Sequence, residues 1–120
     1  MIIQAVQQTL AAVLTSYSKI APQSAELPFC VHAETGIPIR TKAGITGYTY
    51  KVNIVLVAAT NTQLGTNTES IIAAVEDMEG QTIKSTEIEA VDFESDDPDY
   101  DEASEVFINT ISFTIETNNR

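Results

Sequence analysis

The chain is poor in the residues that supply disulfides and positive charge. Its 120 residues include one cysteine, one histidine, no tryptophan and six lysine and arginine residues. A single cysteine cannot form an internal disulfide, which argues against a secreted, disulfide-stabilised protein, and six bases do not make a nucleic-acid-binding patch. No apolar run approaches the ~20 residues that span a membrane, and the N-terminus lacks the basic segment of a signal peptide. We therefore expect a soluble protein made in a reducing cytoplasm.

Acidic residues, in contrast, are abundant and concentrated. Ten of the 17 Asp and Glu residues lie between Glu87 and Glu105, where no lysine or arginine interrupts them, and the net charge of the chain is −11. Such a segment repels nucleic-acid phosphates and anionic lipids. With 43% hydrophobic and 19% charged residues, the composition is typical of a globular protein, and we expect residues 1–120 to form a single domain.

Hydrophobic periodicity predicts one helix and two strands in the first half of the chain. Apolar residues at three- and four-residue spacing predict a helix from about Ile2 to Lys19. A short strand is expected over Phe29–Glu34, a loop over Thr35–Gly44 and a long strand over Ile45–Ala59. The long strand is apolar on both faces near its end, so a helix or a neighbouring subunit should cover each face there.

The second half is predicted to contain one helix and two further strands. Thr66–Glu69 has the pattern of a capping box and Gly80 suits a helix C-terminus. Acidic residues in the last turn oppose the helix dipole, which is either a small inconsistency that the helix tolerates, the interpretation we favour, or the mark of a cationic partner. Strands are expected over Thr82–Glu94 and Glu105–Thr117, with Ser95–Ser104 as a polar hairpin loop. The order α-β-β-α-β-β predicts an α/β (α+β) domain, in which two helices pack on one face of a four-stranded antiparallel or mixed sheet.

The acidic segment does not predict a metal site. Asp97, Asp99 and Asp101 have the spacing that opens an EF-hand loop. However, Glu102 stands where that loop requires glycine, and Ile108 stands where it requires glutamate. We therefore interpret the segment as a solvated turn.

Catalysis is not predicted either. Cys30 and His32 are expected to lie on the outer face of one strand, close enough to form a pair. Nothing in the sequence marks an oxyanion hole beside them, and a zinc site would need more ligands of this kind. We expect a protein that is not an enzyme, with no metal and no cofactor.

Short segments along nearly the whole chain carry a family resemblance. They are Ala21–Gln23, Leu27–Val31, Ser70–Val75, Ile88–Asp96 and Phe107–Ile115. Together with the N-terminal helix and the acidic turn before an alternating last strand, they resemble the tail terminator (tail completion) proteins of long-tailed bacteriophages and prophages. The usual arginine- or tryptophan-rich end of the last strand is replaced here by Glu116-Thr117-Asn118-Asn119-Arg120.

The resemblance implies a tail-terminator-like structural protein. Such a protein forms a ring, expected to be a homohexamer, that caps the tail tube, stops its polymerisation and presents a surface to the head. Its partners would be further copies of itself, the tail tube protein and the head connector protein, in the bacterial cytoplasm during assembly and then in the virion tail. Membrane binding and sequence-specific DNA binding are not expected. A head–tail connector or neck protein, or a small acidic protein-binding module, is the alternative.

Two groups of residues are the candidates for this function. Opposite charges on separate protrusions favour head-to-tail association of copies. The expected subunit interface comprises Arg40, Lys42, Tyr48, Tyr50, Val55 and Val57. The acidic segment would either line a lumen through which DNA slides, since like charges disfavour phosphate contacts, or meet the basic loop of the next subunit. Its candidate residues are Asp96, Asp97, Asp99, Asp101 and Glu102.

Overall fold

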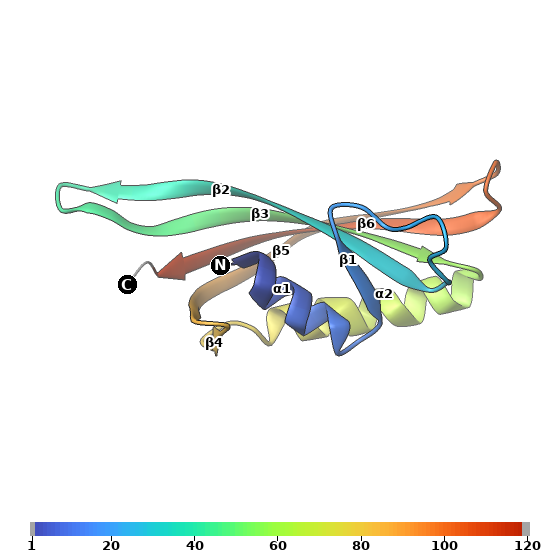
Figure 1. The fold of residues 1–120 in the computed structure, drawn as a ribbon, viewed down its shortest axis with the longest axis horizontal. Helices are drawn as coiled ribbons and strands as arrows, with labels where there is room; N and C mark the ends of the chain where they lie inside the picture. Colours follow the sequence, from blue (N-terminus) through green and yellow to red (C-terminus); the bar gives the residue numbers. More distant parts are fainter. Residues whose placement is uncertain (1, 119–120) are drawn as a thin grey trace.

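The computed structural model describes residues 2–118, which form two helices and six strands (Figure 1). In chain order these are α1 (Ile2–Ala11), β1 (Thr15–Ser18), β2 (Phe29–Thr41), β3 (Gly44–Ala58), α2 (Asn61–Glu76), β4 (Thr82–Ile83), β5 (Thr86–Asp101) and β6 (Val106–Asn118). Neither helix is long and apolar enough to cross a membrane.

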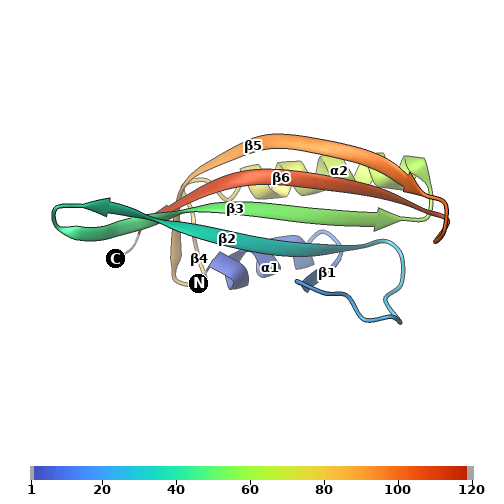
Figure 2. The same cartoon turned by 90° about the horizontal axis from the view of Figure 1, so that it is seen from above.

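The strands form one mixed sheet in the order β1-β2-β3-β6-β5-β4. β1 and β2 run parallel, and every other neighbouring pair is antiparallel. Both helices lie on the same face of the sheet (Figure 1), and Figure 2 shows the other face without a helix over it. The predicted four-stranded sheet and the order α-β-β-α-β-β are therefore wrong, because the described residues follow the order α-β-β-β-α-β-β-β.

The two strands that the sequence pattern missed are short and form the edges of the sheet. The predicted first helix ends already at Ala11, where two N–H groups of the following turn bond to the carbonyl of Leu10, and the chain then enters β1. Between β4 and β5, Lys84 and Ser85 have φ values of 50° and 65°, as in the two-residue turn of a tight hairpin. The strand predicted over Thr82–Glu94 is therefore a hairpin followed by the first part of β5.

The hydrophobic core lies between the two helices and the face of the sheet that they cover. Paired residues of neighbouring strands share a face, so Ile54 of β3 and Ile111 of β6 point together into this core and are fully buried. Val6 of α1 and Ile71 of α2 close the core from the other side. All buried apolar side chains of the described residues belong to this one cluster.

α2 begins earlier than predicted. Thr60 is its N-cap, and Thr60 Oγ1 accepts a hydrogen bond from Gln63 N (3.1 Å). Gln63 Oε1 in return accepts one from Ala59 N (3.0 Å). These reciprocal bonds act as a capping box does, so the prediction of a capping box at Thr66–Glu69 was wrong.

β2 and β3 extend as a long hairpin beyond the helices, at the left of Figure 1. Residues 37–49 are called the arm below. Thr41 and Gly44 form the last pair before the turn at its tip, so most of the loop predicted over Thr35–Gly44 is strand. The arm contributes to an elongated molecule, with extents of 51 × 24 × 22 Å.

β5 likewise continues through most of the predicted hairpin loop. The loop was expected over Ser95–Ser104, but the strand runs to Asp101 and the turn spans residues 102–105. Pro98 is compatible with this strand because β4 pairs only with the start of β5, so that Pro98 lies at a sheet edge and its missing N–H costs no ladder hydrogen bond. Residues 119 and 120, which belong to the departure from the family pattern, lie outside the described residues.

Candidate functional site

The face of the sheet that no helix covers, called the open face below, is apolar at the end away from the arm. Strand pairing places Phe29 beside Val57, and Val57 beside Ile108. Tyr17 of β1 packs edge-on against Phe29, with ring centroids 6.0 Å apart. These side chains are half-buried although no helix lies above them. Such an apolar surface is a candidate contact for another protein chain.

A hollow of about 460 Å³ lies at this end of the open face. Strands β2, β3 and β6 supply its apolar floor, and the loop between β1 and β2 forms one wall. Asp101 and Ser104, at the end of β5 and in the turn after it, lie on another side. The hollow, called the end hollow below, is lined by Pro22, Gln23, Ala25, Leu27, Phe29, Val57, Asp101, Ser104, Val106 and Ile108.

The structure does not bring the predicted interface residues into one patch. Tyr48 and Tyr50 point to the helix-bearing side of β3, where their rings stack with centroids 5.6 Å apart. Val55 and Val57 point to the open face instead. A Cβ atom at Gly36 would lie 2.6 Å from the Tyr50 ring, so the glycine leaves room for that ring across β2. Burial, and to a smaller extent Tyr48, raise the pKa of Tyr50.

The acidic candidates are divided in a similar way. Asp97, Asp99 and Asp101 alternate along β5 and share the open face, where they pair with the apolar end of β6. Asp96 points to the helix-bearing side, where its carboxylate accepts a hydrogen bond from a buried asparagine. Glu102 is exposed in the turn. The open face therefore carries an acidic row beside the end hollow.

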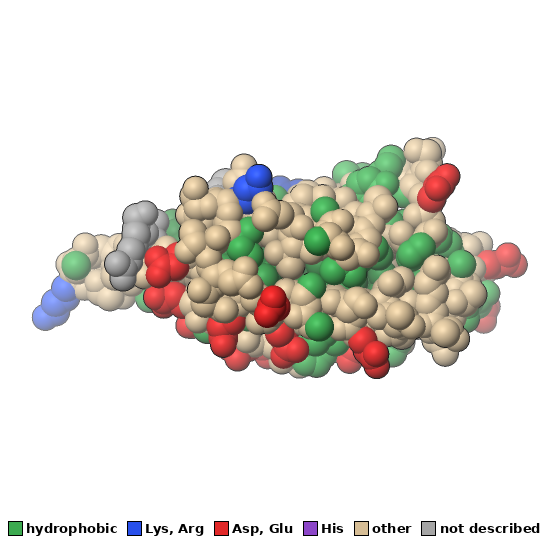
Figure 3. Space-filling model, turned by 90° about the horizontal axis from the view of Figure 1, so that it is seen from below, with side chains coloured by type: hydrophobic (Ala, Val, Ile, Leu, Met, Phe, Trp, Pro, Cys, Tyr) green, Lys and Arg blue, Asp and Glu red, His purple; other side chains and the backbone are tan. Residues whose placement is uncertain are grey.

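The basic candidates lie at the opposite end of the molecule. Arg40 and Lys42 are exposed at the tip of the arm. Figure 3 shows basic side chains at the far left, where the arm ends, and acidic side chains along the lower edge and at the right-hand end. Within residues 2–118, neither Arg40 nor Lys42 forms an ion pair. Arg40 and Lys42 at the arm tip thus lie at the opposite end of the sheet from the acidic row of β5 (Figure 1).

Asn109 is a buried polar residue that the sequence analysis did not single out. Its Nδ2 donates to Thr68 Oγ1 of α2 (3.0 Å) and to Asp96 Oδ2 of β5 (3.3 Å). Its Oδ1 accepts a hydrogen bond from Asp97 N (3.0 Å). The asparagine therefore holds the acidic strand β5 against β6 and α2. Its position among the inward-facing apolar residues of the last strand is the signal that could have located it.

Cys30 and His32 lie on the helix-bearing face and are fully buried, so the expectation that they face outward was wrong. His32 Nδ1 is 2.5 Å from Glu34 Oε2, and His32 Nε2 is 2.6 Å from Gln7 Oε1 of α1. Gln7 Nε2 donates to the Ser16 carbonyl (3.1 Å). Burial raises the pKa of Cys30 to about 12. Since the thiolate is the reactive form of cysteine, this arrangement supplies no activated nucleophile.

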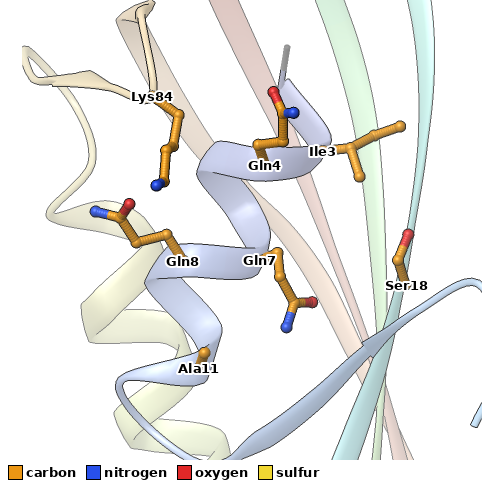
Figure 4. Close-up of a pocket in the computed structure, with 7 residues that line it drawn as sticks. All are labelled: Ile3, Gln4, Gln7, Gln8, Ala11, Ser18 and Lys84. Carbon is orange, nitrogen blue, oxygen red and sulfur yellow. The ribbon is translucent and has the colours of Figure 1, made fainter.

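Another hollow, of about 430 Å³, lies beside α1 (Figure 4). Lys84, from the turn between β4 and β5, extends toward Gln8 of α1, and Ser18 lies on the far side of the helix. The lining residues include no carboxylate, histidine or cysteine. Within residues 2–118 no group of three or more His, Cys, Asp or Glu side chains is placed to hold a metal ion.

Comparison with known proteins identifies a similar fold. No protein-family model and no curated protein sequence matches the chain. Among solved structures, the chain is similar to a chain of the "Virion of native gene transfer agent (GTA) particle", with a TM-score of 0.77 and 14% sequence identity. The similarity covers 96% of this chain and 92% of that one. The two chains share a fold over almost their whole lengths.

Proposed function

We propose that the protein is a structural component of a phage or phage-like virion. The observation that carries this proposal is the similarity in fold, at nearly full length in both chains, to a chain of a gene transfer agent virion. Because the similarity leaves little of either chain unmatched, it concerns the whole protein rather than a common substructure. Virion assembly then supplies the partners, which are other virion proteins.

Within the virion we propose the role of tail terminator, a non-enzymatic ring that caps the tail tube and offers a joining surface to the head. The family resemblance of the sequence supports this role, as do the elongated shape and the separation of basic and acidic surfaces. A subunit with complementary ends associates head-to-tail, and such contacts close into rings when the rotation between copies allows. The ring is proposed to be a homohexamer that lets DNA pass through its lumen.

The decisive experiment is deletion of the gene in a strain that produces the particles, followed by electron microscopy of the lysate. Loss of a terminator removes the stop on tube polymerisation, so we expect tail tubes of excess and variable length. A wild-type copy supplied in trans should restore normal tails. Tails of normal length that lack heads would instead identify a connector or neck protein, and intact particles would argue for a binding module outside the assembly.

The mass of the purified protein tests ring formation directly. We expect native mass spectrometry or sedimentation at high protein concentration to detect a closed oligomer, with hexamer as the largest abundant species. A strict monomer at every concentration, and also in the presence of purified tail tubes, would overturn the ring.

A further inference from the structure

We propose that the tip of the arm of one copy docks in the end hollow of a second copy, with Arg40 and Lys42 against the acidic row of β5. This inference rests on the proposed ring and specifies the contact that builds it. The end hollow fits a hairpin that carries apolar side chains and two positive charges. The arm of this same chain is such a hairpin.

The arm has the surface of a segment that another chain covers. Ile37 is 56% exposed and Ile45 is 37% exposed, although both are large aliphatic residues. They lie close to Arg40 and Lys42 on a two-stranded hairpin, which no helix of the same copy covers. A bare hairpin of this kind gains stability when it packs against further apolar surface. The arm therefore combines unburied apolar area with unpaired positive charge.

The end hollow has the complementary surface. Val57, Val106 and Ile108 contribute an apolar floor, to which Ile45 of an incoming arm tip can add apolar contact. Asp101 lies on its rim, and Asp99 follows two residues earlier on the same face of β5. Complementary charges of this kind fix the orientation of a contact and speed its formation.

The two surfaces cannot meet within one copy. The arm tip lies at one end of the molecule, and the strand ends and the turn that line the end hollow lie toward the other end (Figure 1), along a longest extent of 51 Å. Only an arm from another copy can reach the hollow. Each such contact leaves one arm and one hollow free, so the association continues until a ring closes.

Paired charge reversals test the contact. We expect Arg40→Glu with Lys42→Glu, and separately Asp99→Lys with Asp101→Lys, to weaken self-association at least about tenfold, because like charges then face each other. In a mixture of the two variants each arm can find a hollow of opposite charge, native at one contact and reversed at the next, so the mixture should form oligomers that alternate the two variants, up to the full ring. All four substitutions in one chain should restore the full oligomer. Native mass spectrometry distinguishes these species.

Two further variants serve as controls, one for the change in net charge and one for the loss of a hydrogen bond in the turn. Glu69→Lys with Glu76→Lys makes the same change in net charge as the reversal of the two aspartates, but on exposed positions of α2, and should leave association unchanged. Asp101 Oδ1 accepts a hydrogen bond from Ala103 N (3.2 Å) in the turn. Asp99→Asn with Asp101→Asn keeps a side-chain oxygen for that bond while removing the charge, and should weaken association less than the reversal does. Thermal midpoints of the monomers establish that each variant folds.

The outcomes separate the inference from the function on which it rests. If the wild-type protein forms a ring and both charge reversals form it equally well, the docking contact is wrong and the ring stands. In that case the acidic row is better explained as protection of the β5 edge against indiscriminate strand pairing or as a lumen that repels DNA. If the wild-type protein stays monomeric with tail tubes present, the ring itself is wrong, and the docking contact fails with it.

Discussion

At the scale of single residues, the most constrained position is His32. Both of its ring nitrogens face oxygen atoms, one from Glu34 and one from Gln7. The Gln7 amide is oriented by its bond to the Ser16 carbonyl, so that its oxygen points at the ring. Each ring nitrogen therefore lies within hydrogen-bonding distance of a side-chain oxygen. A buried, hydrogen-bonded His–Glu pair therefore joins two residues of β2 beneath α1.

We expect His32→Leu to destabilise the protein by about 3–5 kcal/mol, because it leaves the Glu34 carboxylate buried without a partner. The double variant His32→Leu with Glu34→Leu should recover most of this loss, since an apolar pair of similar shape can replace a buried ion pair at little cost. Urea unfolding monitored by circular dichroism measures both. A double variant as unstable as the single one would show that packing, rather than the charge pair, sets the cost.

The buried thiol of Cys30 predicts a dependence of stability on pH. Burial raises its pKa from the ordinary value of 9.0 to about 12 in the folded protein. Above pH 9 the unfolded chain releases this proton while the folded chain keeps it, so the contribution of Cys30 to stability falls as the pH rises toward 12. We expect the destabilisation caused by Cys30→Ala to shrink between about pH 8 and about pH 10.5. A constant difference across that range would contradict the assignment.

At the scale of elements, the junction between β3 and β6 depends on a close backbone approach. A Cβ atom at Gly47 would lie 2.1 Å from the Thr117 carbonyl oxygen of β6. This contact is where the arm leaves the body of the sheet, since Gly47 and Asn118 are the last paired residues of the two strands. The arm is thus attached at a point that admits no side chain.

Gly47→Ala tests this junction, and Gly65→Ala in α2 serves as a comparison in which an added methyl group has room. Gly47→Ala should destabilise the protein by about 1–3 kcal/mol, because the backbone of β3 or β6 must shift to admit the methyl group. Gly65 lies inside α2, and a Cβ atom there meets nothing within 4 Å. Gly65→Ala should therefore stabilise the protein by about 0.5–1 kcal/mol through helix propensity. Thermal unfolding of the two variants, compared with the wild type, measures both effects.

Elements with strong hydrophobic periodicity were accessible from the sequence. The last strand was expected over Glu105–Thr117 and spans Val106–Asn118. The four-residue β1 and the two-residue β4 were not accessible, because strands so short have no measurable alternation and are held by pairing with distant segments. The extended path of β5 was missed for another reason: its aspartates favour turns locally, and the hydrogen bond from Asp97 N to Asn109 overrides that preference.

The sequence indicated which residues belong to the candidate site, but not which of them lie together on one surface. Sequence patterning identified the basic and acidic segments, including Arg40, Lys42 and the aspartates of β5. Alternation along the strand already assigns Tyr50 and Val55 to opposite faces. It could not tell which face the helices cover, because both faces of β3 are apolar near its end. The end hollow is formed by segments distant in sequence, which no local pattern encodes.

At the scale of the whole molecule, separated charges predict that salt acts on the rate of assembly. Raising the ionic strength from about 0.1 M to about 1 M shortens the Debye length from about 10 Å to about 3 Å. We expect association to slow strongly, whereas dissociation should change little, because the apolar end hollow holds the docked arm. Stopped-flow light scattering measures the first rate and dilution from the oligomer the second. An association rate that is insensitive to salt would argue against steering by the acidic row.

The topology of the sheet also has a consequence for synthesis. β6 lies between β3 and β5, yet it follows both of them in the chain. The arm and the acidic strand therefore leave the ribosome before the strand that joins them, and pairing of β6 with β3 is a long-range and slow step. Val106 and Ile108, which complete the end hollow, belong to that late strand. Under the proposed docking, a nascent copy could present its arm but not yet accept one, so growth of the proposed ring would be restricted to finished chains.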